Sequence, residues 1–143
     1  MLKPAFIKIM ICAAFLSLTA CDQGSSNAAP KINTIKILDI QPPLDKPLKT
    51  AEKIEMRVKV AYELNSDAAT ITLAVLRADG FGSKSLTSTF VVVKKGKGEL
   101  LLKGEFMVPK RTKLIQVRVP LSPQQRGDTA PTEARTYDVI EVD

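Results

Sequence analysis

Apolar and polar residues alternate along most of this chain, and the alternation predicts β-strands. It is clearest over residues 54–64, where apolar side chains at even positions alternate with mostly charged ones, such as Glu55 and Lys59, at odd positions. A period of two places each set on one face of a strand, so one face is expected to be buried and the other wet. From residue 32 onward, no window of ten or more residues shows the 3.6-residue period of a helix. We therefore expect an all-β protein.

Six further apolar runs have the same character and are separated by turn-forming residues. The seven predicted strands lie within residues 32–40, 54–64, 71–75, 86–93, 100–108, 115–121 and 134–142. In the first run the apolar parity shifts between Ile37 and Leu38, which predicts a bulge. Asn65-Ser66-Asp67 has the composition of a turn, and the lysine- and glycine-rich residues 94–98 resemble a hairpin tip. Pro120, near the end of the sixth run, predicts an edge or a terminus there.

Seven short strands with regularly spaced turns predict one β-sandwich domain over residues 32–143. In strand pattern this domain resembles immunoglobulin-like and fibronectin type III-like domains. The Cys-Trp-Cys signature of antibody domains is absent, because the chain has no Trp and its two cysteines, Cys12 and Cys21, both precede the domain. A small β-barrel is the alternative, since the same alternation can build a closed sheet.

The N-terminal segment has a different pattern. Lys3 and Lys8 accompany an apolar run over residues 9–18, which is too short for a permanent membrane span and is typical of a secretory signal peptide. The residues that follow, Leu18-Thr19-Ala20-Cys21, resemble the lipobox of bacterial lipoprotein precursors. The resemblance implies cleavage before Cys21 and lipidation of that cysteine with diacylglycerol and fatty acids such as palmitate. An ordinary cleaved signal peptide is the alternative.

On this interpretation the chain divides into three parts: a signal peptide at 1–20, a flexible linker of small polar residues at 21–31, and the sandwich at 32–143. Asp22 and Gln23 follow the cysteine directly. In enterobacteria-like lipoproteins an aspartate at this position resembles an inner-membrane retention signal, and a glutamine after it fits that pattern. The expected location is the periplasmic face of the inner membrane, with the outer membrane as the alternative.

Composition narrows the chemistry of the mature protein. The chain has no His, and removal of residues 1–20 leaves Cys21 as the sole thiol. This excludes a disulfide, a Cys–His metal site and a Ser-His-Asp triad, so we expect no cofactor, no metal and no enzymatic activity. Tyr62 and Phe90 are aromatic, but their parity places them in the core. With no Trp and few other aromatics the chain is poorly supplied for stacking on bases, and no nucleic-acid partner is expected.

Basic residues concentrate between positions 94 and 118, where eight Lys and Arg side chains face two Glu. A candidate contact surface for anionic groups comprises Lys94, Lys95, Lys97, Lys110, Arg111 and Lys113. If the strands form a meander, however, the two halves of this set lie at opposite ends of the sheet. Charged tips that keep sheet edges from pairing between molecules explain the lysines more simply.

The polar loop at residues 122–133 contains Arg126-Gly127-Asp128, which matches an integrin-binding tripeptide. A periplasmic domain cannot meet an integrin, so we interpret the tripeptide as a chance match. The expected function is a membrane-tethered module that docks an envelope protein through a strand edge or loops. The alternative is a surface lipoprotein of the outer membrane that binds glycan or host protein through this loop.

Overall fold

The computed structural model describes residues 29–79 and 84–143, and this part of the chain contains six strands and no helix. Two strands are long, with 25 and 23 residues. The strands are β1 (Thr34–Gln41), β2 (Leu48–Lys49), β3 (Lys53–Arg77), β4 (Ser85–Met107), β5 (Leu114–Pro123) and β6 (Thr132–Ile140). The expected all-β class is confirmed, and all seven predicted apolar runs contribute residues to strands.

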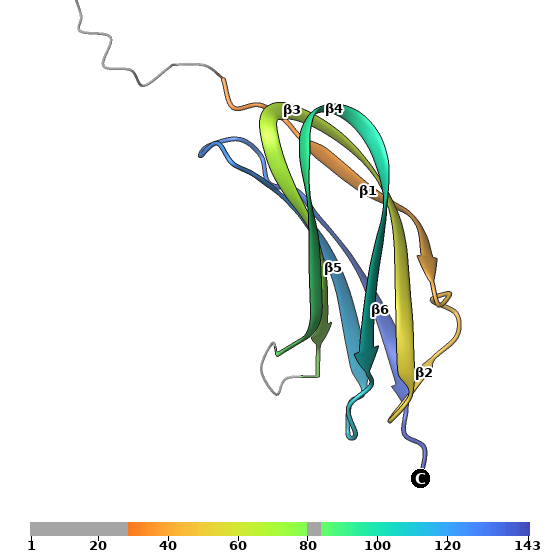
Figure 1. Ribbon diagram of the computed structural model, residues 1–143. Coiled ribbons are helices and arrows are strands. Elements are labelled where there is room, and N and C mark those ends of the chain that lie inside the picture. The colour runs from red at the N-terminus through yellow and green to blue at the C-terminus, as the bar shows by residue number, and fades with distance from the viewer. Residues whose placement is uncertain (1–28, 80–83) are drawn as a thin grey trace, which may run out of the picture.

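The long strands β3 and β4 form one antiparallel ribbon that bends back on itself, and the bend forms an arch at one end of the molecule (Figure 1). Residues 53–64 of β3 pair with residues 96–107 of β4, and residues 68–76 pair with residues 85–94. The pairing register shifts between Leu64 and Ala68, where the ribbon bends. A bulge increases the local twist of a strand, which allows the same strand to continue in a second layer.

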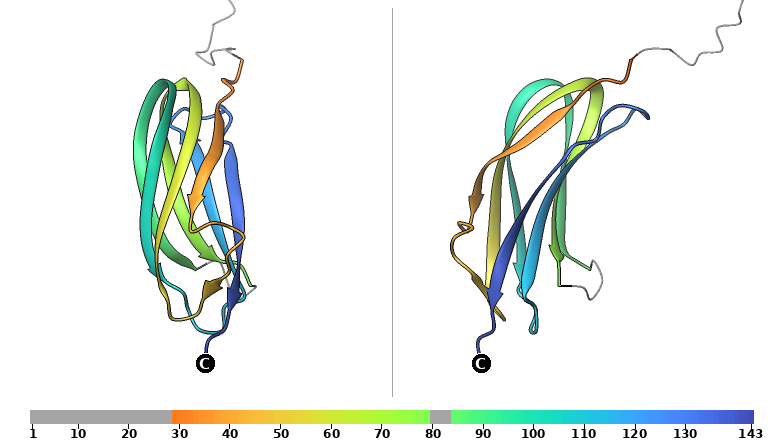
Figure 2. Two further views of the ribbon diagram at one scale, coloured as in Figure 1. Left: turned by 90° about the vertical axis from the view of Figure 1, so that its right-hand side faces the viewer. Right: turned by 180° about the vertical axis from the view of Figure 1, so that it is seen from behind.

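The bent ribbon folds the sheet into two layers that enclose the core. β1 joins residues 53–64 of β3 in the first layer, whereas β5, β6 and β2 extend from residues 69–77 of β3 in the second. β1 also contacts β5 and β6 across the interior. The chain enters at the arch end and its C-terminus lies at the opposite end, as the views from the side and from behind show (Figure 2). The arrangement is a β-sandwich.

Two predicted turns are wrong, and for the same reason. Asn65-Ser66-Asp67 lies inside β3, and residues 94–98 lie inside β4, so both segments bend continuous strands instead of ending them. Turn-forming residue types also suit a bulge, because both structures need unpaired backbone groups to be satisfied. Gly96 has a φ of 137°, which only glycine adopts readily. By contrast, the turn-forming residues between the fifth and sixth apolar runs do separate two strands, since β4 ends at Met107 and β5 begins at Leu114.

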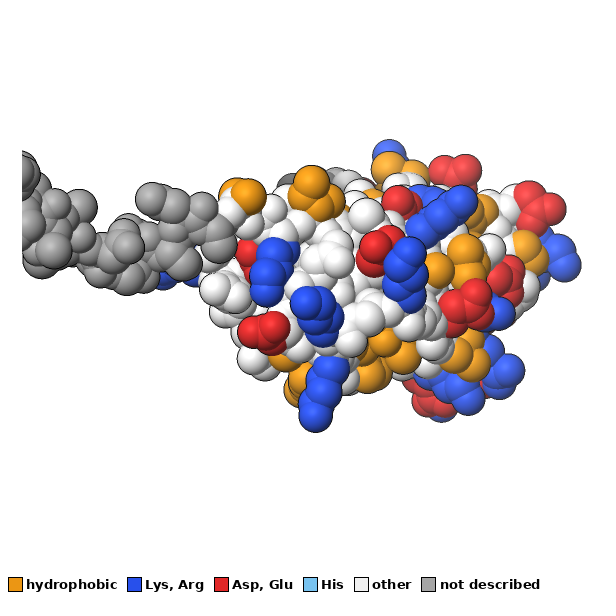
Figure 3. Space-filling view, turned by 90° about the horizontal axis from the view of Figure 1, so that it is seen from above, with side chains coloured by type: hydrophobic (Ala, Val, Ile, Leu, Met, Phe, Trp, Pro, Cys, Tyr) orange, Lys and Arg blue, Asp and Glu red, His pale blue; other side chains and the backbone are white. Residues whose placement is uncertain are grey.

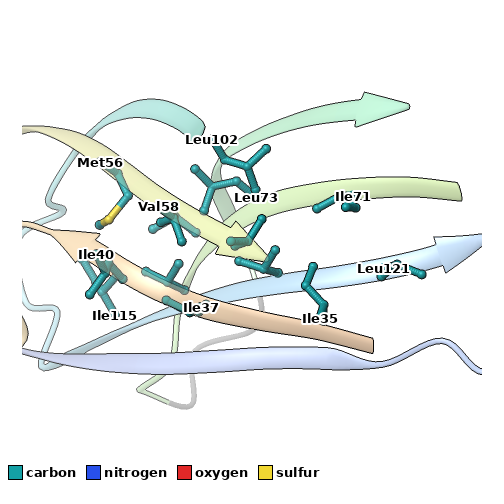
Figure 4. Packing of buried hydrophobic residues seen from close by; sticks show 14 of the residues in the cluster. Ile35, Ile37, Ile40, Met56, Val58, Ile71, Leu73, Leu102, Ile115 and Leu121 are labelled. Atoms are coloured by element: carbon teal, nitrogen blue, oxygen red, sulfur yellow. The ribbon is translucent and has the colours of Figure 1, made fainter. Parts of the chain in front are cut away.

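The alternating pattern identifies the core correctly in most strands. Side chains from the two layers interdigitate between the sheets, among them Met56, Val58 and Leu73 (Figure 4). Four apolar residues of β5 are fully buried, namely Ile115, Val117, Val119 and Leu121. Tyr62 packs against the core while partly exposed. Phe90 is the exception: 68% of its surface is exposed, so its placement in the core is wrong. It lies on the outer face of β4, opposite Thr72.

The two local predictions within strands have different outcomes. Leu38 lies at a register shift in β1 and is exposed, which confirms the bulge. Pro120 does not mark an edge, since β5 lies between β3 and β6, but it does mark a terminus, because the β5–β6 ladder ends at the Pro120–Thr132 pair. The β3–β5 ladder is instead interrupted between the Ile71–Leu121 and Ala74–Arg118 pairs, beside Pro120. Proline has no N–H to donate, and the sheet tolerates it at this interruption.

Candidate functional site

Three of the expected functional residues, Cys21, Asp22 and Gln23, lie outside the described residues. What the structure describes is the point where the chain enters the domain. Hydrogen bonds to the domain begin at Lys31, whose backbone N–H donates to Asp128 Oδ1 at 3.0 Å and whose carbonyl accepts from Thr129 N at 3.0 Å. Among the described residues, no helix is long and apolar enough to cross a membrane.

The centre of this entry site is Asn33, a buried polar residue just before β1. Its Oδ1 accepts hydrogen bonds from the backbone N–H groups of Asn65 at 2.8 Å and Ser66 at 3.2 Å. Its Nδ2 donates to Ser66 Oγ at 2.9 Å and to the Thr129 carbonyl at 3.0 Å. The Asn33 side chain therefore satisfies the backbone groups that the bulge in β3 leaves unpaired.

Asp128 completes the entry site from the loop between β5 and β6. The Ser66 hydroxyl donates to Asp128 Oδ2 at 2.6 Å, while Lys31 N donates to Oδ1. These two hydrogen bonds, that of Ser66 first, hold the pKa of the Asp128 carboxyl below its usual value. The aspartate of the Arg126-Gly127-Asp128 tripeptide is thus bonded within the domain, and its carboxylate has a structural role.

The six basic residues of the expected anionic surface do not come together. Lys94, Lys95 and Lys97 lie at the arch, whereas Lys110, Arg111 and Lys113 lie in or beside the β4–β5 turn at the opposite end (Figure 1). Lys97 Nζ lies 3.4 Å from Glu63 Oε2. Viewed from the arch end, basic and acidic side chains are interspersed over the surface (Figure 3). The expected separation is present, although β4 pairs with β3 and not with β5, so these strands do not form the meander from which the separation was inferred.

A shallow hollow with a volume of about 510 Å³ lies on the outer face of the first layer. Its lining comprises Thr34, Lys36, Ala61, Tyr62, Glu63, Lys97, Gly98 and Glu99. Its acidic groups pair with neighbouring cations, Glu63 with Lys97 and Glu99 with Lys59 at 3.1 Å. The two acidic side chains of the hollow are therefore neutralised by lysines, and the hollow contains no cluster of reactive groups. Within residues 29–79 and 84–143, no group of three or more His, Cys, Asp or Glu side chains is placed to hold a metal.

A candidate surface that the sequence did not single out is the edge formed by the first half of β4 (residues 85–94). Phe90 and Val92 project from it and are 68% and 56% exposed. Residues 85–93 contain no charged side chain and no proline. The sequence does contain a signal for this surface, namely the uncharged run between Lys84 and Lys94. The alternating pattern predicts only an ordinary strand there, because it assigns the apolar residues of the run to the core.

Comparison of the chain with protein-family models and with curated proteins found no match.

Proposed function

We propose that this protein is a lipid-anchored binding module on the periplasmic face of the bacterial inner membrane, where it docks an envelope protein. The anchor is the lipidated Cys21 of the lipobox-like motif, and Asp22 with Gln23 retains the protein in the inner membrane. The observation that supports a tethered role is the entry site. Lys31 and Asn33 fix the start of the domain to the arch through Ser66, Asp128 and Thr129.

The tether, residues 21–31, joins the domain at the entry site. Cys21 and Lys31 are ten positions apart, so the tether reaches at most about 35 Å when fully extended. A domain held within this distance of the bilayer meets membrane-associated partners at a high effective concentration. The arch faces the tether, and the β4–β5 turn and the C-terminal end lie away from it.

The proposed activity is binding and not catalysis. The sequence has no His, and after cleavage its single thiol is consumed by the lipid. The titratable groups with lowered pKa values, Glu55, Asp79 and Asp128, are each paired with a neighbour on the domain: Arg57, Arg77 and Ser66. Such pairs are typical of structural carboxylates, whereas a general acid or base needs a pKa close to the working pH.

Location and anchoring are tested together by fractionation of cells that produce the full chain. The proposal predicts inner-membrane association, protection from external protease in intact cells, and digestion once the outer membrane is opened. Cys21→Ser is expected to abolish processing at this site and lipid attachment. An Asp22→Ser variant is the matched control for sorting, and it is expected to keep the lipid but move to the outer membrane. Digestion of the unaltered protein in intact cells would favour the surface alternative and refute the inner-membrane location.

A further inference from the structure

Most sheet edges in the described part of this sandwich are protected against added strands. β1 has the bulge at Leu38, and β2 covers part of β6 through its pairing with Val139 and Ile140. The second half of β4 (residues 96–107) has ion pairs on its face, including Lys53–Glu105 at 3.0 Å. Bulges, covering segments and charged side chains are the usual means by which proteins prevent unwanted strand addition.

The second half of β4 is also engaged from the inside. The Thr89 hydroxyl, on the first half of the same strand, donates to the Lys103 carbonyl at 3.0 Å. The side chain of Thr87 approaches Gly104 closely, since a Cβ built at Gly104 would lie 3.2 Å from Thr87 Cγ2. These contacts draw the two halves of β4 together and close this side of the sandwich without pairing their backbones.

Between residues 87 and 93, which we call the free edge, the first half of β4 has no bulge, no charged side chain and, among the described residues, no covering segment, and Thr87 and Thr89 contact the second half only through their side chains. In the described part of the chain, the free edge pairs with β3 on one side only, and its register there is regular from Thr87 to Val93. On such a strand, alternate N–H and C=O groups point away from the neighbour and are available to another strand. Its side chains Phe90, Val91 and Val92 are 68%, 39% and 56% exposed.

The charged residues that flank the free edge along the chain are all basic. Lys84 precedes it, and Lys94 and Lys95 follow it. None of these three lysines forms an ion pair with another described residue. The β3 residues opposite the free edge, 69–75, are uncharged. An uncharged strand that is basic at both ends complements a segment that is apolar in its middle and acidic at its ends.

We propose that the free edge of β4 binds an extended segment of the envelope partner as an additional β-strand, apolar at alternate positions and flanked by Asp or Glu. This inference rests on the proposed binding function and specifies its site. Main-chain hydrogen bonds supply much of the affinity, and the apolar side chains of the segment lie beside Phe90 and Val92. Acidic flanks meet Lys84 at one end and Lys94 with Lys95 at the other.

A second copy of this chain is a poorer occupant of the same edge. Antiparallel pairing of two free edges would bring Lys94 and Lys95 of each copy close to Lys84 of the other. Parallel pairing would set each lysine beside its own counterpart. Like charges at close cross-strand positions oppose pairing, and lysines that flank an apolar strand deter self-association. The same lysines attract an acidic segment.

The test is site-specific photo-crosslinking in cells that produce the lipidated full chain. A photoreactive phenylalanine analogue replaces Phe90, Val92 or, as the matched control, Leu101, which is 54% exposed on the other half of β4. We expect adducts from positions 90 and 92 but not 101. We also expect the captured peptide to be apolar at every second residue with acidic flanks. A synthetic peptide of that sequence should bind the purified mature protein.

Charge reversal then tests whether the lysines at the two ends of the free edge attract the acidic flanks of the segment. Lys84→Glu, Lys94→Glu and Lys95→Glu together should weaken binding of the synthetic peptide at least about tenfold. The same three-charge reversal at the opposite end, Lys110→Glu, Arg111→Glu and Lys113→Glu, should leave binding unchanged. Thermal unfolding of both variants establishes that each is folded. A captured segment without acidic flanks, or equal binding by both variants, would overturn the proposal.

Three further outcomes separate this inference from the function on which it rests. Adducts from position 101, with none from 90 or 92, would refute the free edge as the site while leaving a docking function intact. Adducts that join two copies of the chain would show that the free edge binds a second copy and not an envelope partner. If no position on the domain captures an envelope protein, the docking function itself fails.

Discussion

The Ser66 hydroxyl donates a hydrogen bond to Asp128 Oδ2 at 2.6 Å and joins residues 62 positions apart in the chain. Ser66 is fully buried in the bulge of β3, and Asp128 belongs to the loop before β6. Through the second carboxylate oxygen, Asp128 also holds the backbone of Lys31. The bend of the ribbon, the β5–β6 loop and the entry of the chain are therefore coupled in one hydrogen-bonded unit.

The importance of Asn33 to this unit is measurable. Asn33→Ala removes the acceptor for the N–H groups of Asn65 and Ser66, and Ser66 is buried. Leaving buried donors unsatisfied costs about 1–3 kcal/mol, so we expect a loss of this size in the free energy of unfolding. Asn65→Ala is the control, because its exposed side chain donates only to the Ile32 carbonyl. Urea unfolding measures both, and equal losses would contradict the central position of Asn33.

The Asp128 carboxylate should make stability depend on pH in the acidic range. Its pKa in the folded protein lies below the ordinary value of 3.8, because the hydrogen bonds from Ser66 and Lys31 favour the charged form. The unfolded chain therefore binds this proton at higher pH than the folded protein. The resulting stabilisation is present above about pH 4 and is lost as the pH falls through the folded pKa.

Asp128→Asn measures this contribution. We expect the variant to be less stable than the unaltered protein near neutral pH, and the difference to shrink at about pH 3. Asp67→Asn is the control, because the Asp67 side chain is 85% exposed and its contact with Lys31 is 3.8 Å long. Urea unfolding at both pH values gives the comparison. A difference that stays constant with pH would show that the Asp128 charge is not used in the fold.

Truncation of two phenylalanines on the same strand should change the free energy of unfolding by very different amounts. Phe106 is 5% exposed and packs in the core, whereas Phe90 is 68% exposed. Phe106→Ala is expected to cost about 3–5 kcal/mol of unfolding free energy. Phe90→Ala is expected to change it by less than about 0.5 kcal/mol. Chemical denaturation of the two variants decides the matter, and a large loss at Phe90 would place that residue in a packed environment.

The bend in β4 depends on the backbone of Gly96. At its φ of 137° an added Cβ meets no atom within 4 Å, so the cost of Gly96→Ala comes from backbone conformation alone. We expect a loss of about 1–3 kcal/mol in the free energy of unfolding. The neighbouring Lys95→Ala serves as the control and should be nearly neutral. If Gly96→Ala is equally neutral, the conformation at this position is not needed for the bend.

The sequence predicts the core of this fold because the period-two pattern is a direct consequence of strand geometry. Val58 and Val117 lie in the core because each alternates with polar neighbours. The same rule fails at Phe90, because alternation assigns a residue to a face without saying whether that face is covered. Phe90 and Val92 share a face that no other described strand packs against, and only the tertiary arrangement reveals this.

The turns were harder to predict because a bulge and a turn use the same residue types. Asn65-Ser66-Asp67 ends a strand only if its backbone groups are satisfied locally, and here Asn33, more than 30 positions away, satisfies two of them. No local pattern contains that information. The role of Asp128 could not be predicted for the same reason, since its partners, Ser66 and Lys31, lie 62 and 97 positions away in the chain.

The anchor is the central claim of the functional account, and the mass of the mature protein tests it most directly. The full chain is produced in bacteria, extracted from membranes with detergent and measured intact by mass spectrometry, with Cys21→Ser as the control. We predict a chain that begins at Cys21 and carries diacylglycerol and fatty acid on that residue, whereas the control retains residues 1–20 without lipid. A mature protein that begins elsewhere, or that begins at Cys21 with a free thiol, would contradict the account.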